Sequence, residues 1–218
     1  MTEIPNLIVL FVGISLLPLM VVSCTSFLKI AVVLLITRNA LGLQQVPPNI
    51  VVYCIAFATT IFVMAPVLQP LGEWINMSEF PNQLSSKSNN SIPGLVNELS
   101  EPMKAFMVKH TRPALQEMLL ESAAKLWPEN MRTEISKNHW ALVLPSFVLS
   151  ELQSAFEIGF LIYLPFVAID LLVANLLLAL GMQMVSPMVI STPLKLLLFI
   201  VINGWTNLLS KLMLTYQS

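Results

Sequence analysis

The sequence predicts an all-helical membrane protein with about four long, kinked apolar helical segments and a soluble helical insert between the second and third. Of the 218 residues, 56% are hydrophobic and 11% charged, whereas an average soluble domain has roughly 25% charged residues. The mean hydropathy is +0.78. The charges are also concentrated, with 15 of 23 between Glu73 and Lys137. A soluble core could not cover this much apolar surface, so lipid is the expected solvent.

The first 72 residues are expected to form the N-terminal apolar segments. Residues 4–28 carry no charge, which is enough for a span of about 20 residues. Glu3 is the only early charge, so the basic part of a signal peptide is missing and we expect the segment to be retained. The second span is predicted from Ile50 to Leu68. The residues expected to stop it are Pro66, Pro70 and Gly72.

Residues 73–139 form the predicted polar helical insert. A Ser/Asn-rich connector from Asn76 to Asn90 leads into it. Ser100 and Thr111 are predicted helix N-caps, since Pro follows each within the first turn. The short loop between the first two spans is basic, so the positive-inside rule places that loop in the cytoplasm and the insert outside.

Residues 140–218 are predicted to form a C-terminal helical hairpin. The apolar region from Trp140 to Leu180 would measure roughly 60 Å as one helix, twice the thickness of a bilayer's hydrocarbon core. It must therefore be two helical parts, with Pro165 a candidate bend, or one helix that extends beyond lipid. Gly181–Pro193 is expected to be a turn, and Leu194–Leu214 the last apolar run.

Several polar residues lie inside these apolar segments. A carboxylate at the bilayer centre costs about 2.5–3.5 kcal/mol, so such groups are expected to face water or protein. Two interpretations remain open: pairing across subunits that fixes their packing, and a direct role in ion or proton movement. For Lys195 we expect a carboxylate partner in its own or a neighbouring subunit. The candidates for inter-subunit contacts are Lys29, Glu151, Glu157, Asp170, Asn175, Lys195 and Asn203.

A second candidate site is the uncharged turn that contains Met182, Gln183 and Met184. Methionine is unbranched and deformable, so a ring of such side chains could close around varied shapes. On a single chain the pattern also fits a plain loop tip packed in lipid or protein. The gate interpretation requires several copies to meet on one axis.

No enzymatic, metal, cofactor or nucleic-acid site is expected. Asp170 is the only aspartate, which excludes an intramembrane aspartyl pair, and the seven glycines form no phosphate-binding loop. Cys24 and Cys54 lack metal-ligand spacing. The net charge of −1 gives no basic face for nucleic acid.

Several motifs in order resemble the FliP/YscR/SpaP family of inner-membrane export-gate proteins of bacterial type III secretion systems. They are SFLKIAVVLLITRNALGLQQVPPNIV, SELQSAFEIGFLIYLPFVAIDLLVANLLLALGMQMVSP and STPLKLLLFIVINGW. The segments QQVPPN and GMQMVSP are closer to the injectisome branch, linked to virulence, than to the flagellar branch. The resemblance covers nearly the whole chain.

This resemblance implies a homo-oligomer of about five copies, assembled with small two-span and larger R-type membrane proteins into a protein-conducting secretion pore. Unfolded polypeptides would pass through it, and Met182, Gln183 and Met184 would form the gasket of the closed pore. Two residues depart from the family pattern. Gln183 interrupts the consecutive methionines, and Asn203 stands where many relatives carry an aspartate.

We therefore expect a non-enzymatic, multi-pass subunit of the type III secretion export apparatus in the bacterial inner membrane, with a periplasmic insert. One alternative is a small-solute or ion channel, or a transporter, that uses the same buried carboxylates. The other is a purely structural scaffold for assembly.

Overall fold

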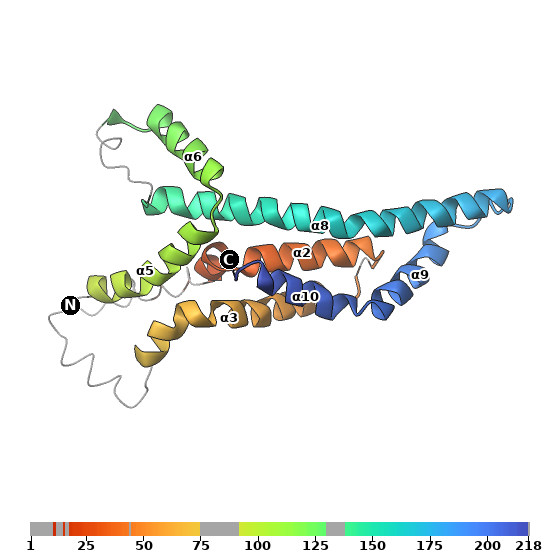
Figure 1. The fold of residues 1–218 in the computed structure, drawn as a ribbon, viewed down its shortest axis with the longest axis horizontal. Coiled ribbons are helices and arrows are strands. Elements are labelled where there is room, and N and C mark those ends of the chain that lie inside the picture. Colours follow the sequence, from red (N-terminus) through yellow and green to blue (C-terminus); the bar gives the residue numbers. More distant parts are fainter. Residues whose placement is uncertain are drawn as a thin grey trace. The chain divides into compact units, whose positions relative to one another are not determined.

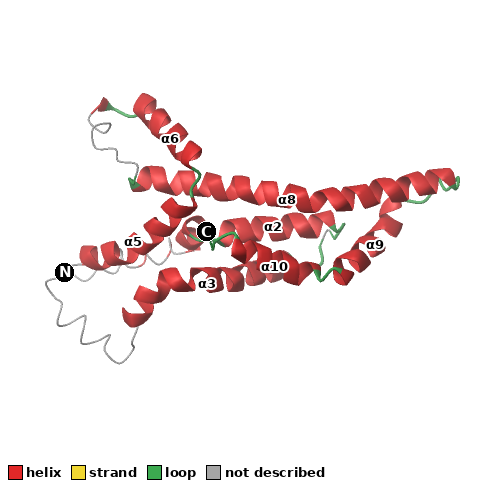
Figure 2. Cartoon of the chain, viewed as in Figure 1, coloured by secondary structure: helices red, strands yellow, loops and turns green. Residues whose placement is uncertain are grey.

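The computed structural model describes residues 11, 15, 18–43, 45–74, 92–129 and 138–217. Within these residues every regular element is a helix, which confirms the predicted all-helical class (Figure 2). Helices α3 (Asn49–Trp74) and α8 (Trp140–Ala179) are each long and apolar enough to cross a membrane. Counting each bent pair of shorter helices as one span brings the number of candidate spans among the described residues to four.

The two bent pairs surround these long helices in the sequence. In the first pair, a helix over Pro18–Cys24 is followed after a break by α2 (Phe27–Ala40). Inside the predicted first span of residues 4–28, the described part is therefore broken at residues 25–26. The Thr25 hydroxyl accepts a hydrogen bond from the Phe27 N–H at 3.3 Å, which satisfies a donor at the start of α2.

Helix α8 resolves the predicted alternative for the third apolar region. It is one continuous helix of 40 residues, uninterrupted at Pro165 (Figure 1). The predicted second span, Ile50–Leu68, matches the candidate span Asn49–Gln69. Helix α3 itself runs to Trp74, so the prediction that Pro66, Pro70 and Gly72 would stop it was wrong. A proline removes only one hydrogen bond and membrane helices tolerate that loss when neighbouring groups compensate.

The described part of the insert contains helices α5 (Ile92–His110) and α6 (Pro113–Leu126). Both predicted N-caps were wrong. Ser100 lies inside α5, which continues through Pro102, and the N-cap of α6 is Arg112, one residue after Thr111. The Thr111 hydroxyl instead donates to the Met107 carbonyl at 2.6 Å, closing the end of α5. The predicted connector at 76–90 lies outside the described residues.

The chain divides into two compact units, and the boundaries between them fall within α2, α3 and α8. In the first unit, residues 1–28 and 64–151, the rings of Phe106 and Phe147 meet edge to face with centroids 5.9 Å apart. The buried Ser150 hydroxyl on α8 accepts from the Arg112 N–H at 3.1 Å and donates to the His110 carbonyl at 3.3 Å. The turn between α5 and α6 is therefore fastened to α8.

The second unit, residues 29–63 and 152–218, contains most of α2, the first part of α3, the second part of α8, α9 (Pro187–Val201) and α10 (Gly204–Leu214). Helix α9 turns back from the end of α8 (Figure 1). The predicted run Leu194–Leu214 is not one helix, because α9 and α10 meet at a 62° bend. Asn203 adopts a left-handed backbone there, with φ 51° and ψ 45°, a conformation that asparagine tolerates better than most residues.

Candidate functional site

The turn between α8 and α9 is shorter than predicted, since α9 already begins at Pro187. Gly181, with φ 73°, ends α8. Its N–H donates to the Leu178 carbonyl at 3.0 Å, and the Met182 N–H donates to the Leu177 carbonyl at 2.9 Å. This pair of bonds is the Schellman arrangement that ends many helices. Pro187 then suits the first position of α9, because no N–H is needed there.

The hairpin tip, residues 178–190, carries the three predicted gasket residues. Met184 is fully exposed, Met182 is 44% exposed, and Gln183 is also exposed. No charged residue lies between Asp170 and Lys195. Other exposed apolar side chains on the tip are those of Leu178, Leu180, Met188, Val189 and Ile190. The tip is therefore an uncharged apolar surface that a single chain leaves uncovered in water, as is typical of a contact site with lipid or protein.

The base of the same hairpin, the part of α8 and α9 around Asp170 and Lys195, carries charged residues. The Lys195 ammonium Nζ lies 2.5 Å from Oδ2 of Asp170 on α8 and donates to the Ala40 carbonyl of α2 at 3.1 Å. The Lys195 side chain is buried, whereas 39% of the Asp170 side chain is exposed. Ala40 ends α2, and a cation at a helix C-terminus is favourable because the last carbonyls are partly negative. Lys195 thus ties three helices together.

The partner of Lys195 comes from its own chain, one of the two possibilities that the sequence left open. The packing around the pair is tight. The rings of Phe166 and Phe199 lie 6.2 Å apart and share a buried cluster with Ala40 and Leu41. Next to this cluster Gly42 has φ 79°, and a Cβ there would lie 2.8 Å from Oγ1 of Thr192 on α9. The Lys195–Asp170 pair therefore lies beside closely packed side chains of α2, α8 and α9.

The other predicted candidates lie apart from this cluster. The Lys29 ammonium sits 4.0 Å from the centre of the Tyr216 ring, a cation–π contact. Glu151 is buried in the first unit, and exposed Glu157 accepts a hydrogen bond from Gln153 at 3.2 Å. Asn175 is exposed on α8, while Asn203 is the N-cap of α10. An inter-subunit role for these residues stays a prediction.

Arg38 is a buried residue that the sequence reasoning did not select. Its Nη1 donates to Oδ1 of Asn49 at 2.6 Å and to the Pro47 carbonyl at 3.1 Å, joining the end of α2 to the start of α3. The signal was available: a basic residue in the last turn of a helix, just before a Pro-Pro-Asn turn. Among the described residues, no cluster of three His, Cys, Asp or Glu could hold a metal ion.

Comparison with known proteins adds the family context. Residues 10–212 match the FliP family. The chain is 51% identical over 212 residues to the harpin secretion protein HrpW of Pseudomonas syringae pv. syringae, covering 97% of this chain and 100% of that protein. It is 42% identical over 211 residues to the Yop proteins translocation protein R of Yersinia pestis, covering 97% and 95%. The virulence protein YscR of Salmonella typhimurium is 41% identical over 206 residues, covering 93% and 92%.

Proposed function

This chain belongs to the FliP family, and we propose that it forms the protein-conducting gate of a bacterial type III secretion export apparatus with copies of itself and partner membrane proteins. Its place as a subunit of that apparatus follows from the family and from relatives named for harpin secretion and Yop translocation. These relatives belong to the injectisome branch. The family is a structural component of the apparatus, and we propose that this chain catalyses no reaction.

The observation that carries the gate proposal is the uncharged, exposed hairpin tip. The Met184 side chain is fully exposed within one chain. Because the apolar helices of this protein require contacts with lipid or protein, such a side chain is expected to be covered by one of them. Methionine side chains adapt to irregular shapes, so several tips meeting on one axis would seal a pore and still yield to a passing chain. Gln183 between the two methionines would make that seal wetter than one of methionine alone.

The assembly around the gate is proposed in the same way. Because the family and the apolar helices place this protein in the inner membrane as a multi-pass protein, its copies can meet in one bilayer. We propose about five copies, with small two-span and larger R-type membrane proteins as partners and unfolded polypeptides as cargo. The basic loop between the first two spans supports a cytoplasmic position for that loop and a periplasmic position for the insert.

The test replaces two of the three tip methionines, Met182→Ala and Met184→Ala, in the full chain within its assembled apparatus. We expect a larger leak of a small fluorescent dye across the inner membrane, because two deformable side chains per copy are lost from the seal. The matched control is Met118→Ala. Met118 is 47% exposed on α6 and does not belong to the tip, so the same loss of a methionine there should cause no leak.

Two other outcomes would contradict the gate proposal. If the double variant secretes normally without a leak, while deletion of the chain abolishes assembly of the apparatus, the chain is a scaffold. If the wild-type complex in liposomes conducts ions or takes up a solute selectively, and the tip variants leave this conductance unchanged, the channel alternative is correct.

A further inference from the structure

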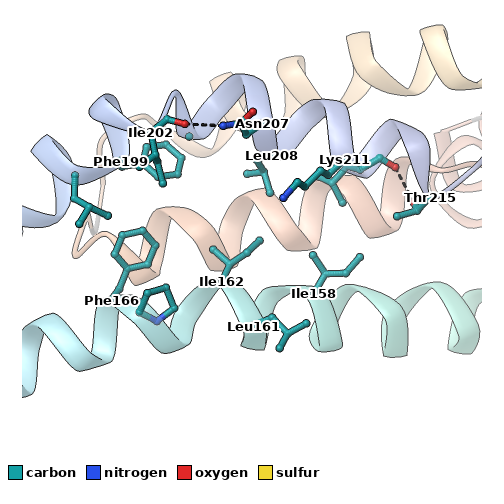
Figure 3. Close-up of a pocket in the computed structure, with 14 residues that line it drawn as sticks. Ile158, Leu161, Ile162, Phe166, Phe199, Ile202, Asn207, Leu208, Lys211 and Thr215 are labelled. Carbon is teal, nitrogen blue, oxygen red and sulfur yellow. Dashed lines mark hydrogen bonds between the residues drawn. The ribbon is translucent and has the colours of Figure 1, made fainter.

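An apolar groove of about 500 Å³ lies within the second unit, between α8 and the pair α9–α10. Ile158, Leu161 and Ile162 of α8 line one side, and the other side includes Leu208 of α10 (Figure 3). Its volume falls in the range of roughly 300–1,000 Å³ that is typical of small-ligand sites. The groove is separate from the hairpin tip, since none of the tip residues lines it.

A single cationic side chain, Lys211, lines this groove. It stands in the last turn of α10, and its side chain extends along the groove below Leu208 (Figure 3). Within the described part of the chain, Lys211 Nζ makes no ion pair, side-chain hydrogen bond or ring contact, and the Lys211 carbonyl accepts a hydrogen bond from the Thr215 N–H at 3.2 Å. An ammonium beside apolar side chains is stabilised by an anionic partner.

A carboxylate from a second copy is the less favourable partner. The second unit contains two acidic residues, Glu157 and Asp170, and both already have partners within their own chain, Gln153 and Lys195. A carboxylate that a second copy brought to Lys211 from these helices would therefore have to share its existing partner, and the Asp170 oxygen that lacks a hydrogen bond within the described residues, Oδ1, is buried. The Lys211 of that second copy would add a like charge to the interface.

A membrane phospholipid satisfies both features of the groove. Lys211 lies near the end of the last apolar run of the sequence, where a lysine reaches the headgroup level of a bilayer. An acyl chain would cover the apolar side chains of α8 and α10, and the phosphate would face the ammonium. We propose that this groove is a binding site for one anionic phospholipid, a role independent of the proposed gate.

The test measures lipid retained by the full-length, detergent-extracted complex, using native mass spectrometry after exchange into phosphatidylglycerol or phosphatidylcholine. We expect the wild type to retain phosphatidylglycerol preferentially. Lys211→Gln should reduce this preference about fivefold, the size expected for one lysine near an anionic membrane surface. The matched control is Lys125→Gln on α6, an exposed lysine outside the groove, which should leave the preference unchanged.

A second pair of variants tests the acyl-chain contact. Leu161 is 67% exposed and lines the groove, whereas Leu164 is 46% exposed on the same helix and does not. Leu161→Phe should reduce retention of both lipids, because the larger ring fills the groove, and Leu164→Phe should not. Equal retention in all four variants and the wild type overturns the proposal. So does a change in the number of protein copies without a change in retained lipid, since that result assigns the groove to a second copy.

Discussion

The two ends of the α8–α9 hairpin differ in burial and in charge. At the base, Lys195 is buried and contacts Asp170 and the end of α2 in one chain. At the tip, Met184 is fully exposed and no charge lies within ten residues of it. The base is completed by contacts within a single chain, whereas the tip has apolar surface that only lipid or other chains can cover. The Lys195–Asp170 pair therefore joins helices within one chain, whereas the uncharged methionines belong to the proposed gate.

This difference is informative because both features are equally conspicuous in the sequence. A carboxylate in an apolar segment is a usual sign of an ion or proton pathway. Here Lys195 contacts both Asp170 and the C-terminal carbonyl of α2. The pair thus joins α8 and α9 to the end of α2.

The largest effect is expected at the base. Asp170→Ala should lower the free energy of unfolding by about 3 kcal/mol, since it leaves the buried Lys195 ammonium without its counter-ion. Lys195→Ala should cost less, about 1–2 kcal/mol, because the Asp170 carboxylate that remains is partly exposed. Thermal unfolding of the detergent-solubilised protein measures both.

The double variant Asp170→Leu/Lys195→Leu serves as the control for this pair. Removing both charges leaves no unpaired group, so its stability should exceed that of Asp170→Ala. Equal losses in the two single variants would show that the exposure difference between the two side chains does not matter, and the account of the base would need revision.

A smaller effect is expected where α2 and α8 pack closely. A Cβ at Gly159 would lie 2.5 Å from Cδ1 of Ile36, so Gly159→Ala should destabilise the protein by about 2 kcal/mol through overpacking. Adding Ile36→Val removes that Cδ1 and should recover part of the loss, measured in the same unfolding experiment. If the second substitution recovers nothing, this contact is not what limits the approach of the two helices.

The smallest effect on stability is expected at the tip. Met184→Ala should change the free energy of unfolding of the isolated chain by less than about 0.5 kcal/mol, because its side chain is fully exposed. The melting temperature of the unassembled chain in detergent measures this. A loss comparable to that of Asp170→Ala would mean that the tip packs within its own chain and would remove the contrast between tip and base.

Periodicity and composition were sufficient to predict the apolar helices, because a long uncharged run in lipid must satisfy its backbone internally. Trp140 was correctly placed at the start of the third region, and α8 ends at Ala179, one residue before the predicted end. Proline was a poor boundary signal, since α3 continues past Pro66, a predicted stop, and α5 continues through Pro102, which was expected in the first turn of a helix. In α3, which lies in an apolar segment, continued helix is favoured over an exposed backbone.

The sequence could not predict which residues contact one another across helices. Nothing in the spacing of Lys195 and Asp170 distinguishes a partner in the same chain from one in a neighbour, and the Ala40 carbonyl that Lys195 also contacts carries no sequence signal at all. The bend between α9 and α10 did have a signal, the Asn203-Gly204 pair, because asparagine accepts a left-handed backbone. It was hidden within an otherwise uniform apolar run.

The central claim is that the tips of several copies meet on one axis, and cysteine cross-linking tests it most directly. Met184→Cys is introduced into a Cys54→Ser background, since Cys54 is exposed and Cys24 is buried. Mild oxidation of the assembled complex should give disulfide-linked dimers of this chain on a non-reducing gel. Met118→Cys in the same background should remain monomeric. If Met184→Cys also stays monomeric in a fully assembled complex, the tips do not meet and the proposed gate is contradicted.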